Sequence, residues 1–275
     1  MSRLKLTANS QITEFGDTLD LDFLKTTKYL LNGVNLRFRF NRASSAFCLQ
    51  KYKDDTAVNY KLKILSMKLS LRKVLPEVSI LTAHERILAK TTAKYEFDRL
   101  VFRNFNIPKD SNNHTLENIF NGMLPQKIIF MLCDTEDFTG SLSTNPYNFQ
   151  HKNISHVSLF VDQTPLINHN LNFSDSKYIE FFQNFYFHLG YTNPHKGNLE
   201  ITRDDFKNGY TIMVYDLSTD LNAGTHLNLH RTGNLRLSLT FATTLTKPAT
   251  ILIIGSFSNL VQIDKDRKVF HDFKL

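Results

Sequence analysis

The sequence predicts an all-β protein whose main body is an antiparallel β-sandwich. The strongest observation is the stretch from Gly233 to Asp264, whose first part alternates apolar and polar residues. The apolar positions of this alternation are Leu235, Leu237, Leu239 and Phe241. A period of two is typical of a strand with one buried face. After a polar break, Ile251 to Phe257 is apolar on both faces, as expected for an interior strand between two layers.

Composition agrees with a β protein and limits its function. The chain has 275 residues, of which 41% are hydrophobic, with 23 Phe and no Trp. Phe and β-branched residues suit half-buried pleated surfaces, and a chain of this length accommodates one large domain or slightly more. The net charge of +7 is moderate, and the Lys and Arg residues are scattered along the chain. We therefore expect no specific nucleic-acid partner.

The cysteines and the N-terminal residues bear on the cellular compartment. Cys48 and Cys133 lie in apolar, strand-like runs, which predicts buried, reduced thiols and no disulfide. No apolar run approaches membrane-spanning length, and the first residues lack the apolar core of a signal peptide. We therefore expect a protein that is made in the cytoplasm, is not secreted and has no membrane partner.

Residues 15–74 predict three strands, followed by a helical linker at residues 75–93. The alternating apolar positions are Leu19, Leu21 and Phe23, then Leu36, Phe38 and Phe40, then Leu65, Met67, Leu69 and Leu71. Three strands cannot enclose a core by themselves, so this segment needs a partner. Left in water, these ten side chains would forgo roughly 15–30 kcal/mol of burial. The linker is predicted from Pro76 and Glu77, which are typical of a first helical turn.

Residues 94–275 predict the complete sandwich. Strand-like runs occur at residues 95–108, 126–134, 156–162 and 210–217, before the closing stretch. Aromatic and Leu residues at helical spacing predict an amphipathic helix with a packing face, and residues 200–206 predict a capped single turn. The helical positions are Tyr178, Phe181, Phe182, Phe185, Tyr186 and Leu189. About six to eight strands with two helical excursions favour a jelly roll.

Two groups of polar residues invite a chemical interpretation. His226 and His230 have the spacing of a helical zinc pair, but their flanks predict loop and strand, without a third ligand nearby. Asp134, Glu136 and Asp137 crowd together after a strand, where a solvated loop is the simpler interpretation. No phosphate-binding loop, dinucleotide motif or Ser-His-Asp spacing is present. We expect no enzyme, no catalytic, cofactor-binding or metal-binding residues, and no small-molecule substrate.

A series of segments along the chain carries a resemblance to a known family. In order, they are KYLLNGVNLRFRFNR with AFCL, LRKV, AHERILAKTTAKY, FNIP, NPYNFQH, ITRDDFKNGYTIMVYDLSTDL, HLNLHRTGNLRLSLTFA and FSNLVQIDKDRKVFHDF. Together they resemble the double jelly-roll major capsid proteins of Polinton/Maverick-type elements and adintovirus-like viruses. They keep the family's order and cover most of residues 15–275. Family members are longer, with most of a first jelly roll ahead of the point that corresponds to Met1.

The resemblance implies a domain organisation and a function. Residues 1–74 would be the C-terminal strands of an incomplete first jelly roll, residues 75–93 a helical linker, and residues 94–275 a complete second roll. The implied function is a hexon-like structural subunit that assembles with its copies and with other capsid proteins into trimeric capsomers of an icosahedral shell. The implied location is the virion, after synthesis in the host cytoplasm and assembly there or in the nucleus.

Two alternatives belong to other classes of function. The first is a lectin-like jelly-roll module that holds a ligand in its loops, or a domesticated, non-catalytic host protein. The second is a cupin-type metalloenzyme, for which the spacing of the histidines supplies no His/Glu cluster. A single copy of a capsid piece should expose large apolar patches, whereas a binding module should not. On the capsid hypothesis we expect residues 15–74 to form an incomplete sheet with an exposed edge and an apolar face.

Overall fold

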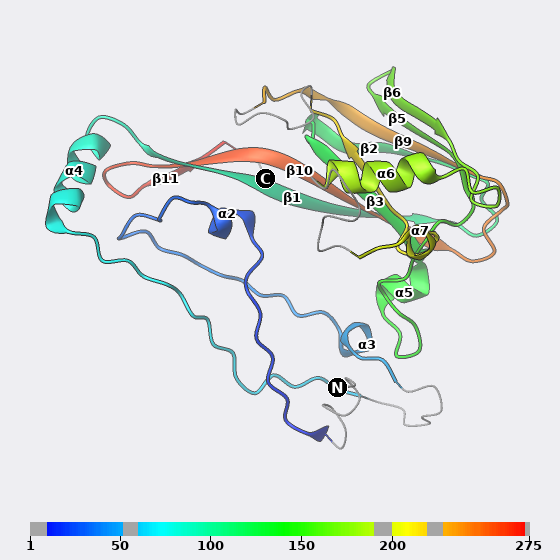
Figure 1. Ribbon diagram of the computed structural model, residues 1–275, viewed down its shortest axis with the longest axis horizontal. Coiled ribbons are helices and arrows are strands. Elements are labelled where there is room, and N and C mark those ends of the chain that lie inside the picture. The colour runs from blue at the N-terminus through cyan, green and yellow to red at the C-terminus, as the bar shows by residue number, and fades with distance from the viewer. Residues whose placement is uncertain (1–9, 52–59, 190–199, 219–227, 273–275) are drawn as a thin grey trace. The chain divides into compact units, whose positions relative to one another are not determined.

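The computed structural model describes residues 10–51, 60–189, 200–218 and 228–272 (Figure 1). The chain divides into two compact units. The smaller unit contains residues 1–34, 85–98 and 259–275, and the larger contains residues 35–84 and 99–258.

Two antiparallel sheets make up the body of the larger unit. The first sheet has the order β1 (Ala93–Ile107), β10 (Ala249–Ile263), β3 (Lys127–Asp134) and β8 (Ile212–Asp216), and β11 (Val269–His271) also pairs with β10. The second has the order β2 (Asn113–Met123), β9 (Thr232–Phe241), β5 (Ile154–Val161) and β6 (Thr164–Asn170). A separate short pair joins β4 (Phe149–Gln150) to β7 (Asn208–Gly209). Strands β1 and β10 contribute residues to both units.

The order of the eight long strands is that of a jelly roll. Counted along the chain from one to eight, the strands read 1-8-3-6 in the first sheet and 2-7-4-5 in the second. Only the connection from β5 to β6 stays within one sheet, and every other step between consecutive long strands crosses to the opposite sheet. This interleaving is the double Greek key of a jelly roll. The predicted fold class is therefore confirmed.

The core lies between the two sheets and is supplied by alternate residues of the strands. Leu235, Leu237, Leu239 and Phe241 of β9 are all buried there, as the alternation predicts. Strand β9 is central, because it pairs antiparallel with β2 on one side and β5 on the other. Leu237 lies opposite Leu116 in one register and opposite Leu159 in the other. The inward face of the closing strands is therefore confirmed.

Three helices accompany the roll. They are α5 (Thr135–Thr139), α6 (Ile179–His188) and α7 (Arg203–Lys207). The predicted aromatic stripe is a packing face, since Phe181, Phe185 and Tyr186 of α6 are buried in the core cluster. The predicted turn is α7, which begins with a reciprocal capping box between Thr202 and Asp205. Helix α5 lies where the sequence predicts a loop.

The smaller unit has its own apolar cluster. It combines β1 and β10 residues with α2 (Asp22–Lys25) and the residues that follow α2. Phe23 packs edge-on against Phe97 and tilted against Tyr95. The Tyr95 hydroxyl donates to the carbonyl of Tyr29 and accepts from the backbone N–H of Leu31. Part of the predicted N-terminal apolar surface is thus buried within this unit.

The described residues of the segment 15–74 form no strand. They contain only the short helices α2 and α3 (Ser45–Cys48), so the prediction of three strands is wrong for this part of the chain. An extended run becomes a strand only beside a neighbour that completes its hydrogen bonds, and these runs have no such neighbour among the described residues. The assignment of this segment to a first jelly roll stays a prediction.

The predicted linker contains a helix, α4 (Val78–Leu88), whose single buried residue is Leu88. No helix in the described ranges has the length and apolar content needed to cross a membrane.

Candidate assembly surface

The outer face of the second sheet is polar, as in an ordinary sandwich. One row across this face contains Thr115 of β2, Ser238 of β9, Ser158 of β5 and Asn168 of β6, which lie opposite one another in successive registers. The hydroxyl oxygens of Thr115 and Ser238 are 3.1 Å apart. The Ser158 hydroxyl donates to Oδ1 of Asn168 at 3.0 Å. These pairs satisfy the polar groups across the strands.

The outer face of the first sheet is apolar instead. Residues of β3 and β10 that face away from the core, Met131, Cys133 and Leu252, form a separate buried cluster. At one end of the sheet this cluster is covered by Phe138 of α5 and Phe149 of β4. The sequence predicts this property, because Ile251–Phe257 is apolar on both faces. A sheet that is apolar on both faces requires a layer on each side.

The edge strand β1 carries the exposed part of this apolar face. Its even-numbered residues point away from the core, and among them Leu100 is 66% exposed and Phe102 is 52% exposed. Strand β1 pairs only with β10 among the described strands, so one of its two edges has no neighbour there. A long edge strand with exposed apolar side chains is a site for association.

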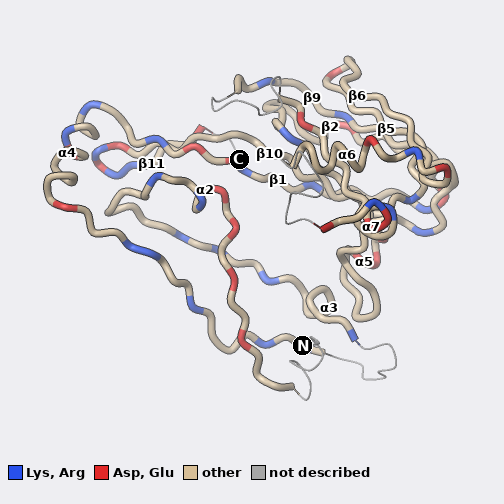
Figure 2. Tube along the Cα trace, viewed as in Figure 1, with Lys and Arg blue, Asp and Glu red and all other residues tan. Residues whose placement is uncertain are grey.

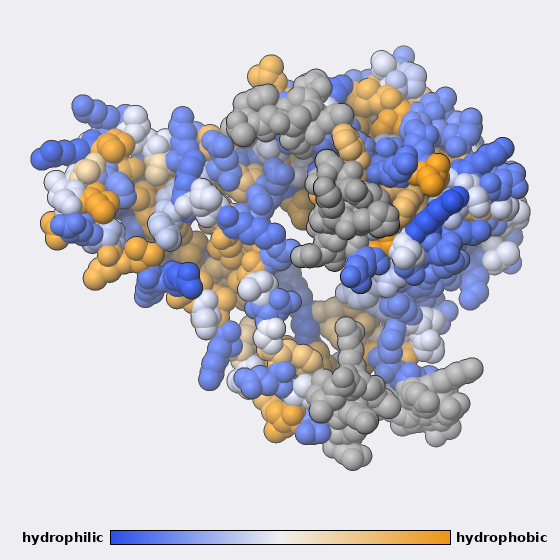
Figure 3. Space-filling view, in the orientation of Figure 1, coloured by the Kyte–Doolittle hydropathy of each residue, from blue (hydrophilic) through white to orange (hydrophobic). Residues whose placement is uncertain are grey.

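Residues 60–75, which belong to the same unit as Leu100 and Phe102, expose apolar side chains as well. Ile64, Leu65, Met67, Leu69, Leu71, Val74 and Leu75 are exposed. The same stretch contains five Lys or Arg residues and no Asp or Glu, as the blue segments leading to α4 show in Figure 2. Apolar atoms also reach the surface around α4 in Figure 3. We call Leu100, Phe102 and the exposed apolar residues of 60–75 the assembly surface.

A clip holds residues 44–51 against the loop that follows β3. The cap residue Ser44 starts α3, and the Phe47 ring packs edge-on against Tyr147. The backbone N–H of Lys51 donates to the carbonyl of Leu142 at 2.7 Å. Gly140 fits beneath α3 because a side chain there would meet the Phe47 backbone at 2.8 Å. The loop between α5 and β4 therefore packs against residues 44–51 through Tyr147 and Leu142.

The acidic residues after β3 are not simply solvated. Lys152 Nζ lies 2.5 Å from Oδ1 of Asp134, so the partner that the sequence does not reveal is present. Asp137 is buried, and burial raises the pKa of its carboxyl above the ordinary value. Within the described part of the chain, no group of His, Cys, Asp and Glu side chains could hold a metal ion. The ion pair of Asp134 with Lys152 ties the end of β3 to the loop before β5.

The two cysteines have different environments. Cys133 is buried, and burial raises the pKa of its thiol to about 11. A thiol of this kind stays protonated and unreactive at neutral pH. Cys48 is exposed, so the prediction that it is buried is wrong. Its strand-like run is the short helix α3, which leaves the thiol in solvent.

A Ser–His–Asn chain on the polar face was not predicted. The Ser158 hydroxyl lies 2.7 Å from Nε2 of His156, whose Nδ1 lies 2.7 Å from Oδ1 of Asn170. This order of groups resembles a nucleophile, a base and an orienting residue. Ser158 is only 6% exposed and also donates to Asn168, so the chain works as a cross-strand network. His156 and Ser158 are two residues apart on one strand, so their side chains share a face. This spacing could have predicted the pair from the sequence.

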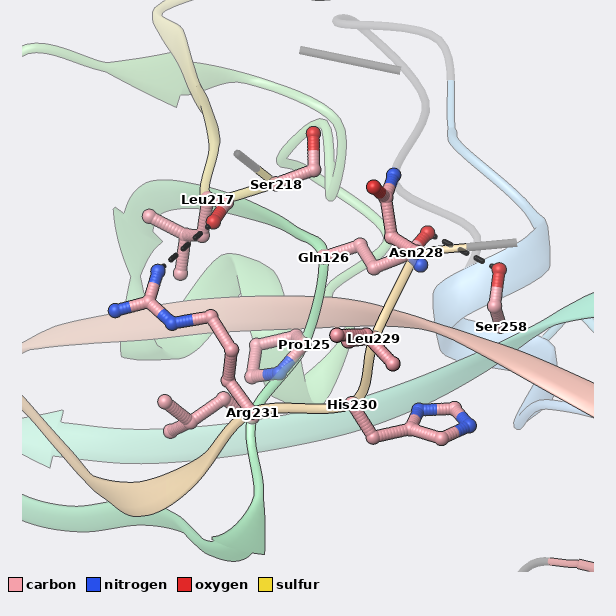
Figure 4. A pocket seen from close by; sticks show the side chains of 10 residues that line it. Pro125, Gln126, Leu217, Ser218, Asn228, Leu229, His230, Arg231 and Ser258 are labelled. Atoms are coloured by element: carbon pink, nitrogen blue, oxygen red, sulfur yellow. Dashed lines mark hydrogen bonds between the residues drawn. The ribbon is translucent and has the colours of Figure 1, made fainter. Parts of the chain in front are cut away.

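Of the two histidines with the spacing of a zinc pair, His226 lies outside the described residues. His230 lines a small pocket formed by the β2–β3 connection, the residues after β8, the residues before β9, and Ser258 of β10 (Figure 4). The Arg231 guanidinium donates to the carbonyl of Leu217, and the Ser258 hydroxyl donates to the side-chain carbonyl of Gln126. The cavity volume of about 20 Å³ accommodates about one water molecule. Such a space does not admit an organic substrate.

Comparison with known proteins finds one curated relative. No protein-family model matches the chain. The uncharacterized protein F54H12.2 of Caenorhabditis elegans is 22% identical over 233 residues, which are 83% of this chain and 55% of the worm protein. The chain therefore spans about half the length of this relative.

Solved structures of viral capsid proteins resemble the chain in part. The similarity to PBCV-1 VP54 has a TM-score of 0.47 at 12% identity and covers 72% of this chain and 55% of that chain. The mavirus major capsid protein gives a TM-score of 0.40 at 14% identity, over 67% of this chain and 42% of that chain. Because these scores lie below 0.5, the strand order and not the similarity assigns the fold. The strand order defines a jelly-roll protein.

Proposed function

We propose that this chain is a structural capsid subunit, or a piece of one, that works by self-association. The observation that carries the proposal is the unequal polarity of the two sheets. The second sheet presents hydroxyl and amide groups outward, whereas the outer side of the first holds the buried apolar cluster of Met131 and Leu252 and exposes Leu100 and Phe102 on β1. Subunits that build a shell need rigid walls with apolar contact surfaces, and a jelly roll with one apolar outer face meets both requirements.

The proposal extends to the domain organisation and the family. We propose that residues 1–74 belong to a first jelly roll, that residues 75–93 link it to the roll of residues 94–275, and that an additional layer covers the apolar outer face. The ordered segments shared with the Polinton/Maverick and adintovirus-like capsid proteins support this arrangement. On the same ground we propose trimeric capsomers, association with other capsid proteins, synthesis in the host cytoplasm and a final location in the virion. No catalytic step is part of this function.

The test compares the parent chain with two matched pairs of substitutions. Leu100→Glu with Phe102→Glu places charges on the apolar edge strand, and Asn113→Glu with Thr115→Glu does the same on the polar edge strand β2. We expect multi-copy particles for the parent and the β2 pair, but monomers with an unchanged melting temperature for the β1 pair. Light scattering after size-exclusion chromatography and negative-stain microscopy measure this. A parent that stays monomeric at high concentration, or equal effects of both pairs, would overturn the proposal.

A second candidate function is a lectin-like binding module, which the polar outer face favours. Hydroxyl, amide and imidazole groups of Thr115, Ser158, His156 and Asn170 gather there, and sugars are recognised by such groups. A glycan array with the parent and with His156→Ala tests it. Binding that His156→Ala abolishes would favour the module over the capsid subunit.

A further inference from the structure

Two extended segments of this chain carry opposite charge. Residues 11–22 contain Glu14, Asp17, Asp20 and Asp22 and no Lys or Arg. Residues 60–75 contain Lys61, Lys63, Lys68, Arg72 and Lys73 and no Asp or Glu. We call these the acidic segment and the basic segment. In a chain whose charges are otherwise mixed, this separation makes the two segments electrostatically complementary.

Both segments expose apolar side chains. Phe15 is 78% exposed in the acidic segment, and Leu75 is 96% exposed in the basic segment. Leu21, Leu69 and Leu71 are exposed as well. Each apolar row is thus exposed in the unit that contains it, and neither segment forms a described strand. Neither residues 15–21 nor residues 69–75 pair with another strand among the described residues.

One antiparallel register matches the two segments residue by residue. In this register Leu19 lies opposite Leu71, and each step forward along one segment pairs with one step back along the other. The remaining pairs are Phe15 with Leu75, Gly16 with Val74, Asp17 with Lys73, Thr18 with Arg72, Asp20 with Ser70, and Leu21 with Leu69. The odd-numbered face holds three apolar pairs with the Asp17–Lys73 pair among them, and no like charges face each other. Cross-strand pairs of these kinds stabilise a ladder.

We propose that residues 15–21 of one copy pair antiparallel with residues 69–75 of a second copy. This inference rests on the proposed self-association and adds a second contact to the one that Leu100 and Phe102 make. The second copy is the partner because the charges of the two segments match each other and the proposed function is self-association. The contact is heterologous, so each copy offers an acidic segment to one neighbour and a basic segment to another. Such contacts close into rings when the rotation allows.

A charge exchange between copies is the first test. Asp17→Lys and Lys73→Asp each place like charges opposite one another, so each variant alone should associate at least tenfold more weakly than the parent. In an equimolar mixture both contacts between unlike variants are complementary, so alternating copies should recover most of the association, and high salt should weaken it. Light scattering measures both. Lys63→Asp, with the same charge change outside the paired residues, is the control. Failure of the mixture to recover while the parent associates would overturn this contact and leave the proposed self-association intact.

A disulfide test separates a second copy from pairing within one chain. In a background of Cys48→Ser, a His-tagged Leu19→Cys chain is mixed with a Strep-tagged Leu71→Cys chain and oxidised. We expect a disulfide-linked species that both tags retain, because opposed residues of antiparallel strands lie within disulfide range. Arg72→Cys in place of Leu71→Cys, on the opposite face, should give none.

The remaining outcomes of that experiment also decide the question. An internal disulfide in the monomeric double variant, without linkage in the mixture, would overturn the second copy as the partner. Binding of the parent to phosphatidylserine vesicles, lost in Lys73→Asp and accompanied by no linkage, would assign the basic segment to a membrane surface and overturn the proposal. A parent that remains monomeric in light scattering would instead overturn the proposed function itself.

Discussion

Burial decides which single residues matter most in this protein, and Leu237 is the clearest example. It is fully buried in the central strand β9, between Leu116 and Leu159 of the neighbouring strands. We predict that Leu237→Asp costs about 4 kcal/mol or more, because it buries an unpaired charge in the core. Chemical denaturation measures the loss. Ser238→Asp, the next residue on the outer face, is the control, and equal stability of the two variants would contradict the assigned faces.

Asp137 should make stability depend on pH. Burial raises the pKa of its carboxyl, and the neighbouring Asp134 and Glu136 raise it further, while the Thr144 hydroxyl and the charge of Lys152 lower it in part. The folded protein therefore holds this proton more tightly than the unfolded chain. The free energy of unfolding thus falls as pH rises from about 4, the ordinary carboxyl pKa, through the raised pKa.

Replacing the carboxyl by an amide removes this effect. We predict that Asp137→Asn has a higher melting temperature than the parent at neutral pH and the same melting temperature at about pH 3, where the carboxyl is protonated in both states. Thermal unfolding across this range checks it. Glu136→Gln, at the exposed neighbouring position, should leave the pH profile nearly unchanged. A parent that is stabilised by raising the pH, relative to Asp137→Asn, would contradict the prediction.

Contacts between residues that are distant in the chain could not be predicted from local sequence patterns. Lys152 pairs with Asp134 from 18 residues away, and local spacing says nothing of such a pair. The Ser158 and His156 pair sits at a spacing of two, which a strand assignment could have revealed. The exposed thiol of Cys48 was missed because an apolar run was taken as a strand, whereas α3 is a single helical turn.

Elements were predictable where the pattern and the partner lie in the same chain. Strand β9 and helix α6 follow from periods of two and of three to four residues, since the sheet and the core that receive them are present. The runs of residues 15–74 have the same period of two and form no strand in the described residues. Periodicity reports which faces are apolar, and the neighbouring strand decides whether a ladder forms. The apolar outer face of β10 was predictable for this reason.

The clip formed by α3 can be tested with two glycines of matching backbone conformation. Gly140 has φ 94° and would meet the Phe47 backbone, whereas Gly122 has φ 95° and open space around it. We predict that Gly140→Ala destabilises by about 1–3 kcal/mol more than Gly122→Ala, because both share the backbone strain but only Gly140→Ala clashes. Denaturation of both variants gives the difference. Equal losses would mean that α3 does not rest on Gly140.

At the scale of the whole molecule, protection from hydrogen exchange should be uneven and should depend on concentration. Strands β3 and β10 are hydrogen-bonded to each other inside a sheet, whereas residues 60–75 form no strand in the described structure. We predict rapid exchange of residues 60–75 in dilute protein and slow exchange of residues 249–258. At high concentration, residues 69–75 should become protected while residues 61–64 stay unprotected. Full protection of residues 60–75 in dilute protein would show that one copy already pairs them.

The strand order also determines when each sheet can be completed during translation. Strand β9 lies between β2 and β5, and β10 lies between β1 and β3, so each sheet receives its central strand after the strands it joins. Strand β2 ends at Met123 and its partner β9 begins at Thr232, a gap that takes roughly 5–20 seconds to translate. During that interval each sheet lacks one of its inner strands. The exposed apolar faces then need chaperones or the ribosomal vestibule to keep them from aggregating. A pause or a premature stop before β9 would therefore release an aggregation-prone chain, although most of its strands have already been made.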